Sequence, residues 1–115
     1  VHAAALFQPQ QETPLVREDV GRHNATDKVI GAALSRSDTI SGCGLFVSGR
    51  ISFEIVQKAA MAGIRWVGGI SAPTSLAVAS ARDLGMEVVG FVRDQSFVAY
   101  SLRPTETPNT TTEKE

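Results

Sequence analysis

The chain has 115 residues, of which 43% are hydrophobic and 20% are charged. This length and composition are typical of one globular domain around a single core, and they exclude an intrinsically disordered or low-complexity chain. The formal net charge is −1 and the 11 basic residues are scattered, so the sequence predicts neither a nucleic-acid surface nor a membrane-surface patch.

A single cysteine, Cys43, limits the chemistry further. One thiol cannot form an internal disulfide or make up a cysteine-rich zinc site. Cys43 lies between two glycines and before an apolar run, so we interpret it as a packed, unreactive thiol. No apolar run reaches the roughly 20 residues that a membrane helix needs.

The first half of the chain predicts a hairpin, a helix and a strand. Apolar-leaning runs at 3–7 and 15–20, separated by a polar loop with two prolines, are typical of a hairpin. Helical spacing then continues to about Ser35, and Asn24 with Asp27 resembles a capping box that starts this helix. The run Leu45-Phe46-Val47 is apolar throughout, which is typical of a strand buried on both faces.

The second half alternates helix and strand before a polar tail. The predicted elements are a helix from about Phe53 to Gly63, a strand over 65–70, a helix from Pro73 to about Leu84, and strands over 87–92 and 96–102. The order ββαβαβαββ predicts an α/β domain over residues 1–102, with a mixed, parallel-centred sheet and helices on both faces. Residues 103–115 have no apolar anchor and predict a disordered tail.

Polar clusters follow four of the predicted strands. In open α/β sheets, ligands bind beyond the carboxyl ends of the strands. Three clusters open onto a helix N-terminus, which attracts anions, and arginine side chains match phosphate oxygens in pairs. The pattern therefore indicates a phosphorylated ligand. The clusters are residues 18–24, 48–50, 71–74 and 93–95, and their arginines are Arg22, Arg50 and Arg93.

Residues of the clusters at 18–24 and 48–50 also have purely structural interpretations. Glu18 and Asp19 can pair with Arg22 or Lys28, and Asn24 can cap a helix. His23 can be a structural hydrogen-bonding group, and Ser48 can belong to a tight turn. The location that the clusters share favours the functional interpretation.

Several kinds of catalytic site are excluded by their motifs. The sequence has no phosphate-binding loop of the Walker type, no dinucleotide fingerprint after a strand, and no nucleophile elbow. A zinc deaminase needs His-x-Glu and a later C-x-x-C, but His2-Ala3-Ala4 lacks the glutamate and the cysteine pair is missing. We therefore expect no zinc and no metal ligands.

Seven segments together resemble the FdhD-type formate dehydrogenase accessory sulfurtransferases. The most specific is Glu18-Asp19-Val20-Gly21-Arg22-His23-Asn24, and the similarity runs in order from Val1 to about Tyr100. The seven segments are Val1–Ala5, Arg17–Ala25, Asp27-Lys28, Val47–Arg50, Ser52–Glu54, Ser71–Thr74 and Gly90–Arg93.

The resemblance implies a cytidine-deaminase-like fold, without zinc chemistry, in a cytoplasmic homodimer. It implies a sulfurtransferase that takes persulfide sulfur from a cysteine desulfurase. The sulfur passes to the molybdenum cofactor, as Mo-bis(molybdopterin guanine dinucleotide), before that cofactor enters formate dehydrogenase. Neither nucleic acid nor a membrane is an expected partner.

The resemblance also implies which residues contact the cofactor. The segment Phe91–Ser96 falls on the family's cofactor-contacting stretch, with Arg93 as the anchor for a phosphate or pterin edge. Phe91 either packs against a ring or belongs to the core, and Asp94, Gln95 and Ser96 are expected to contact through their backbone. The expected cofactor-binding residues are Glu18, Asp19, Arg22, His23, Asn24, Ser48, Arg50, Phe91, Val92, Arg93, Asp94, Gln95 and Ser96.

No catalytic residue is expected within this sequence. The family's persulfide cysteine lies in a C-x-x-C loop that precedes the His2-Ala3-Ala4-Ala5 segment, so it is expected upstream of Val1, and the sequence is expected to be the C-terminal portion of a longer protein. A non-catalytic module that binds a nucleotide or a partner protein is the alternative for this chain alone. A deaminase-like hydrolase is a third hypothesis, which stoichiometric zinc would support.

Overall fold

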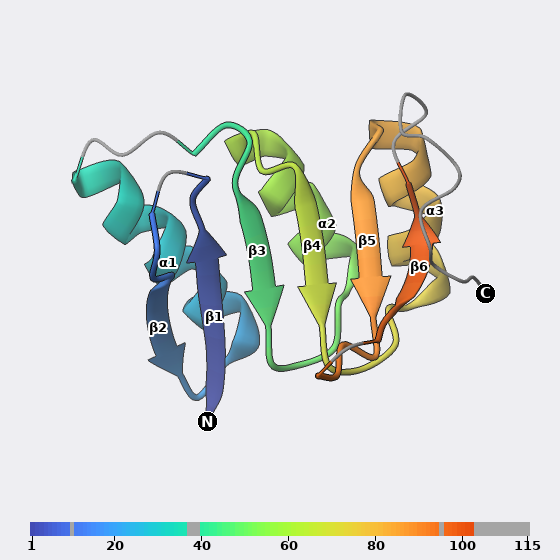
Figure 1. Ribbon diagram of the computed structural model, residues 1–115, viewed down its shortest axis with the longest axis horizontal. Coiled ribbons are helices and arrows are strands. Elements are labelled where there is room, and N and C mark those ends of the chain that lie inside the picture. Colours follow the sequence, from blue (N-terminus) through green and yellow to red (C-terminus); the bar gives the residue numbers. More distant parts are fainter. Residues whose placement is uncertain (10, 37–39, 95, 103–115) are drawn as a thin grey trace.

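The computed structural model describes residues 1–9, 11–36, 40–94 and 96–102. Its elements follow the predicted order ββαβαβαββ (Figure 1). The elements are β1 (His2–Phe7), β2 (Leu15–Asp19), α1 (Arg22–Ser35), β3 (Gly44–Val47), α2 (Phe53–Ala62), β4 (Trp66–Gly69), α3 (Ser75–Leu84), β5 (Glu87–Gly90) and β6 (Val98–Ser101). The predicted α/β class is confirmed, whereas the predicted tail at 103–115 lies outside the described residues.

The six strands form one mixed sheet in the order β2-β1-β3-β4-β5-β6. The central strands β3, β4 and β5 are parallel, β1 is antiparallel to both its neighbours, and β6 is antiparallel to β5. Strands β2, β3, β4 and β5 therefore all point the same way, toward the lower edge in Figure 1. Their carboxyl ends meet at that edge.

All three helices cover the same face of the sheet, and in Figure 1 they lie behind it. The prediction of helices on both faces is therefore wrong for the described residues. Lys58 of α2 donates to Asp27 of α1 at 2.9 Å, so these helices share one layer. The connections from β2 to β3, from β3 to β4 and from β4 to β5 all advance in one direction across the sheet. Right-handed crossovers that advance in one direction place their helices on one face.

The core lies between this helix layer and the sheet. Its fully buried side chains come from alternate strand positions and from the inner faces of the helices. Examples are Leu6, Leu45, Val47, Val67 and Val88 from the strands, and Val29, Ile55 and Val56 from the helices. On the other face of the sheet, Phe46, Trp66 and Val89 stay partly exposed. The prediction that the strand at 45–47 is buried on both faces is therefore wrong: Leu45 and Val47 are buried under the helices, whereas Phe46 is partly exposed on the open face.

Two predicted boundaries shift for local reasons. The third helix begins at Ser75 rather than near Pro73, because the Thr74 hydroxyl accepts the backbone N–H of Ala77 at 3.1 Å and caps it. Strand β5 ends at Gly90 rather than Val92, because Phe91 has a left-handed φ of 52° that turns the chain out of the sheet. Of the helices in the part of the chain that the structure describes, none has the length and apolar character needed to span a membrane.

Candidate functional site

The polar clusters that follow β2, β3, β4 and β5 lie at a single edge of the sheet, as their positions after these strands predicted (Figure 1). Because β1 runs the opposite way, its first residue also reaches this edge, where His2 is paired with Asp19 in register. The described residues that follow β5 lie at the same edge, at the end of the sheet away from β2. We call this carboxyl edge of the sheet the strand-end edge.

Hydrogen bonds join neighbouring segments of the strand-end edge. Ser48 and Ala3 exchange two of them: the Ser48 N–H donates to the Ala3 carbonyl at 3.0 Å, and the Ala3 N–H donates to the Ser48 hydroxyl oxygen at 2.9 Å. The Thr74 N–H donates to the Ile51 carbonyl at 3.0 Å, which ties the loop after β4 to the loop after β3. These bonds fix the relative positions of the loops, so any ligand meets a preformed surface.

The loop after β5 is held in the same way. The Val92 N–H donates to the Gly69 carbonyl at 3.1 Å, and the Arg93 N–H donates to the Ser96 carbonyl at 2.9 Å in a tight turn. Gly90 is required just before this turn, because a Cβ at that position would lie 2.8 Å from the Ser71 carbonyl oxygen. The backbone thus presents Arg93 at the strand-end edge, while Gln95 lies outside the described residues.

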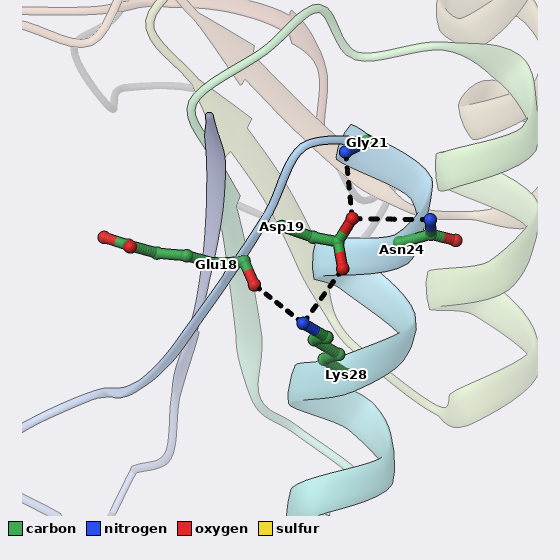
Figure 2. Close-up of polar contacts among 5 residues, drawn as sticks. All are labelled: Glu18, Asp19, Gly21, Asn24 and Lys28. Carbon is green, nitrogen blue, oxygen red and sulfur yellow. Dashed lines mark hydrogen bonds and ion pairs between the residues drawn. The ribbon is translucent and has the colours of Figure 1, made fainter.

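The turn from β2 into α1 is organised around Asp19 (Figure 2). One carboxylate oxygen of Asp19 accepts the Gly21 N–H at 3.1 Å and the Asn24 side-chain amide at 3.4 Å, and the other pairs with Lys28 Nζ at 2.9 Å. Lys28 also donates to the Glu18 carbonyl at 3.1 Å. The hydrogen bond from Lys28, followed by that from Gly21, lowers the pKa of Asp19 to about 2.

The predicted capping box is wrong, although Asn24 is still used structurally. Helix α1 begins at Arg22 with Gly21 as its N-cap residue, so Asn24 already lies in the first turn. Asn24 donates to Asp19, and Asp27 pairs with Lys58 of α2 at 2.9 Å instead of turning back to the helix start. The structural alternative for Asp19, pairing with Lys28, is correct.

The start of α1 carries two basic side chains, and the Asp19 carboxylate lies beside it. No side chain caps it, and Arg22 and His23 occupy the first turn, where the helix dipole already favours anions over cations. Of the side-chain atoms that the structure describes, Arg22 Nε is buried and has no hydrogen-bond partner. A buried donor without an acceptor is costly, so Arg22 Nε is the one buried side-chain donor described at this edge whose hydrogen bond is unaccounted for within the chain.

The Arg22 side chain lies close to the backbone of Gly49. A Cβ on Gly49 would lie 3.2 Å from Arg22 Cδ and 3.0 Å from His2 Nδ1, so both side chains rest on the bare glycine backbone. Glu54 at the start of α2 supplies nearby negative charge. Its pKa is lowered mainly by hydrogen bonds from its own backbone N–H and from the Ser52 hydroxyl, with smaller contributions from His23 and Arg22.

The other two arginines point their charge into solvent. Arg50 and Arg93 are exposed, and within the described residues neither guanidinium group forms a hydrogen bond or an ion pair. The strand-end edge thus combines one partly buried arginine with two exposed ones. This arrangement can bind an extended, multiply charged anion through charge-assisted hydrogen bonds.

One residue of this edge, His2, has no role at the site in the prediction from sequence. The sequence places His2 in a degenerate deaminase motif and in the family-like segment Val1–Ala5, whereas antiparallel pairing of β1 with β2 puts it beside the turn. Gly49 lies within the predicted cluster at 48–50, but its close approach to the side chains of Arg22 and His2 is not predicted. The signal that could have found His2 is the hairpin itself, because an antiparallel β1 brings its amino end to the carboxyl end of β2.

The comparisons with known proteins agree with each other. A family model described as FdhD/NarQ family matches residues 1–105. The sulfur carrier protein FdhD of Streptomyces coelicolor is 53% identical over 102 residues, covering 88% of this chain and 36% of the relative. The protein of the same name from Sulfolobus acidocaldarius is 51% identical over 102 residues, covering 88% of this chain and 40% of the relative.

Solved structures give the same result for the fold. A Desulfotalea psychrophila protein described as a formate dehydrogenase accessory protein superposes with a TM-score of 0.80 at 30% identity, over 90% of this chain and 44% of that chain. A deaminase/reductase from Thermotoga maritima superposes with a TM-score of 0.59 at 18% identity, over 79% of this chain and 29% of that chain. The second match shows the fold alone and confirms the cytidine-deaminase-like prediction. The chain spans between 36% and 40% of the length of the curated relatives it matches.

Proposed function

The chain belongs to the FdhD/NarQ family, and on this basis we propose that it forms the cofactor-binding part of a sulfur carrier that serves formate dehydrogenase. In this proposal the sulfur comes as a persulfide from a cysteine desulfurase. It is passed to Mo-bis(molybdopterin guanine dinucleotide), which the protein binds as its client before the cofactor reaches the dehydrogenase. The working form is a homodimer in the cytoplasm.

The observation that supports cofactor binding best is the buried Arg22 Nε at the start of α1. Among the residues that the structure describes, this nitrogen has no hydrogen-bond partner, and no side chain caps the helix. A phosphate oxygen supplies the acceptor that this nitrogen lacks, and the helix dipole adds to the attraction. The guanine dinucleotide arms of the proposed client carry such phosphates. The chemistry of the donors therefore fits this ligand.

Arg50 and Arg93 extend the same positive surface along the strand-end edge. Their exposed guanidinium groups are available for further phosphate oxygens in the proposed complex. Phe91 is 40% exposed and is held there by a left-handed backbone. Residues kept in such an unfavourable conformation concentrate at ligand sites, which supports placing Phe91 beside a ring of the client.

Sulfur carriage is assigned to a cysteine that this chain does not contain. Cys43 is fully buried and lies immediately before β3, at the edge of the sheet opposite to the strand-end edge. A persulfide there could neither meet a partner nor reach the arginines. In our proposal the part of a family protein that this chain does not match supplies the thiol, and this chain alone binds without catalysing transfer.

Titration with GDP, monitored by calorimetry, tests the proposal. We expect GDP to bind the chain, and we expect Arg93→Ala to weaken binding because it removes one phosphate donor. Arg17→Ala is the matched control, since Arg17 lies on β2 and, among the described residues, its side chain donates only to the carbonyl of Val16. Absence of GDP binding, or equal affinities of Arg93→Ala and the original chain, would contradict the proposed role of this edge.

A further inference from the structure

The face of the sheet that the helices leave open carries an apolar groove of about 520 Å³. Its lining comes from four strands and from the loop after β5, and consists of Phe7, Phe46, Trp66, Val89, Val92 and Phe97, with Glu87 at its margin. Glu87 lies 3.9 Å from Arg65, so its charge already has a counter-ion. The groove therefore offers a ligand almost nothing but apolar and aromatic surface.

The side chains of this groove pack closely against one another and against the backbone of the sheet, as in a protein core, but only from one side. A Cβ on Gly44 would overlap the Trp66 ring, so the indole lies directly on the glycine backbone of β3. The ring of Phe7 packs against it with centroids 5.9 Å apart. Gly68 leaves room between Trp66 and Val89, since a Cβ there would lie 3.2 Å and 3.1 Å from them. The backbone is thus shaped to seat the indole.

The strands under the groove have the composition of strands that are covered on both sides. Parallel strands are usually buried on both faces and read as continuous apolar runs. Leu45-Phe46-Val47 and Val88-Val89 have this character, yet Phe7 and Phe97 are 41% and 45% exposed. An apolar patch of this kind marks a surface that another element covers.

We propose that this groove seats an amphipathic α-helix supplied by the part of an FdhD/NarQ family protein that this chain does not match, on the same polypeptide or on a separate one. Most of the length of the curated relatives lies in that part, because the chain spans 36% to 40% of them. Helices are the elements that cover the faces of such sheets. A phosphorylated ligand is unsuitable, since the groove presents a carboxylate and no unpaired cation among its described residues.

The groove can be followed with one spectroscopic probe, because Trp66 is the only tryptophan of the chain. The tagged chain is co-expressed with the unmatched part of the Streptomyces coelicolor relative. We expect the two to purify as an equimolar complex, in which Trp66 emission moves to shorter wavelength. We also expect acrylamide to quench the emission several-fold less than in the chain alone. Neither GDP nor sulfur enters the experiment, so its outcome is independent of the proposed function.

Two matched substitutions locate the contact. Phe97→Asp puts a charge into the groove wall and should abolish the complex. Leu76→Asp puts the same charge on α3, at a site that is 60% exposed on the helix side, and should leave it intact. Far-ultraviolet circular dichroism confirms that both variants fold.

Three results would overturn the proposal. The first is the absence of a complex. The second is a complex in which acrylamide quenches Trp66 as strongly as in the chain alone. The third is shielding of Trp66 that appears in the chain alone as its concentration rises, because this would assign the groove to a second copy.

Discussion

Helices that begin at the same edge of the sheet begin in opposite ways. Helices α2 and α3 start after Ser52 and Thr74, whose hydroxyl oxygens accept a backbone N–H of the first turn at 3.4 Å and 3.1 Å. Helix α1 starts after Gly21, whose N–H is accepted by the Asp19 carboxylate at 3.1 Å. Among the described residues no side chain accepts an N–H of its first turn, where Arg22 and His23 lie. Two helix starts therefore have one first-turn N–H capped by a side chain, and the third has none among the described residues.

The difference in capping distinguishes helix starts that stabilise the fold from the start that can bind a ligand. A capped start stabilises its helix by itself and has little left to offer a ligand. An uncapped start with two basic residues is unfavourable alone, because like charges meet the positive end of the helix dipole. An anion reverses that balance. The comparison therefore assigns ligand binding to the start of α1 and helix stability to the starts of α2 and α3.

The largest expected effect is that of Arg22→Ala on GDP affinity. Hydrogen bonds to charged groups contribute about 1.5–3 kcal/mol, which corresponds to a loss of roughly 10- to 100-fold in affinity. Arg22→Lys keeps the charge but removes the buried Nε. Its affinity for GDP should therefore lie between that of the original chain and that of Arg22→Ala. The measurement is calorimetry, with Arg17→Ala as the control. An affinity of Arg22→Ala equal to that of the control would show that the unpartnered nitrogen is not part of the site.

The next effect is on stability and concerns a capped start. Thr74→Ala removes the acceptor for the Ala77 N–H, and the loss of an N-cap costs about 0.5–2 kcal/mol. We expect urea unfolding to show this decrease while GDP affinity stays unchanged. If Thr74→Ala weakened GDP binding as much as Arg22→Ala, the division between capped and uncapped starts would be wrong.

The sequence was sufficient for the order of elements, for the parallel centre of the sheet and for the shared edge of the polar clusters. These features follow from local patterns, such as the apolar run at 45–47 and the stop at Gly63, together with the rule that parallel strands end on one side. The helix layer could not be placed in the same way. The direction of every crossover across the sheet depends on strand order, which no local pattern encodes.

The location of the candidate site could be predicted from the sequence, but the roles of its individual residues could be predicted less well. The string Glu18–Asn24 was expected to line the cofactor cleft, but its carboxylate and amide at Asp19 and Asn24 are engaged with each other and with Lys28. Arg22 became distinctive only through the burial of its Nε. The Arg22 side chain packs close to Gly49, which is distant from it in sequence, and no local pattern predicts such a contact.

A smaller effect on stability comes from the hydrogen-bonded carboxylate of Asp19 in the β2–α1 turn, and it depends on pH. The pKa of Asp19 is about 2 in the folded chain, against an ordinary value of 3.8. Because the folded pKa is the lower one, the carboxylate stabilises the fold above about pH 4, and this contribution is lost as pH falls toward 2. Asp19→Asn should therefore lower Tm at neutral pH. The difference in Tm from the original chain should shrink between pH 4 and pH 2. A difference that stayed constant over this range would show that the charge of Asp19 is not what stabilises the turn.

The smallest effect should come from giving α1 the cap that it lacks. Gly21 has φ −107° and ψ 133°, which any residue can adopt, and the atom nearest to a Cβ there would be Nδ2 of the Asn24 side chain, at 3.3 Å. Gly21→Ser should raise stability by only a few tenths of a kcal/mol, since glycine is itself a tolerated N-cap residue. GDP affinity should fall, because the new hydroxyl oxygen competes with the ligand for the N–H groups of the first turn. A rise in Tm without any loss of affinity would mean that these N–H groups do not bind the ligand, and that the arginines alone form the anion site.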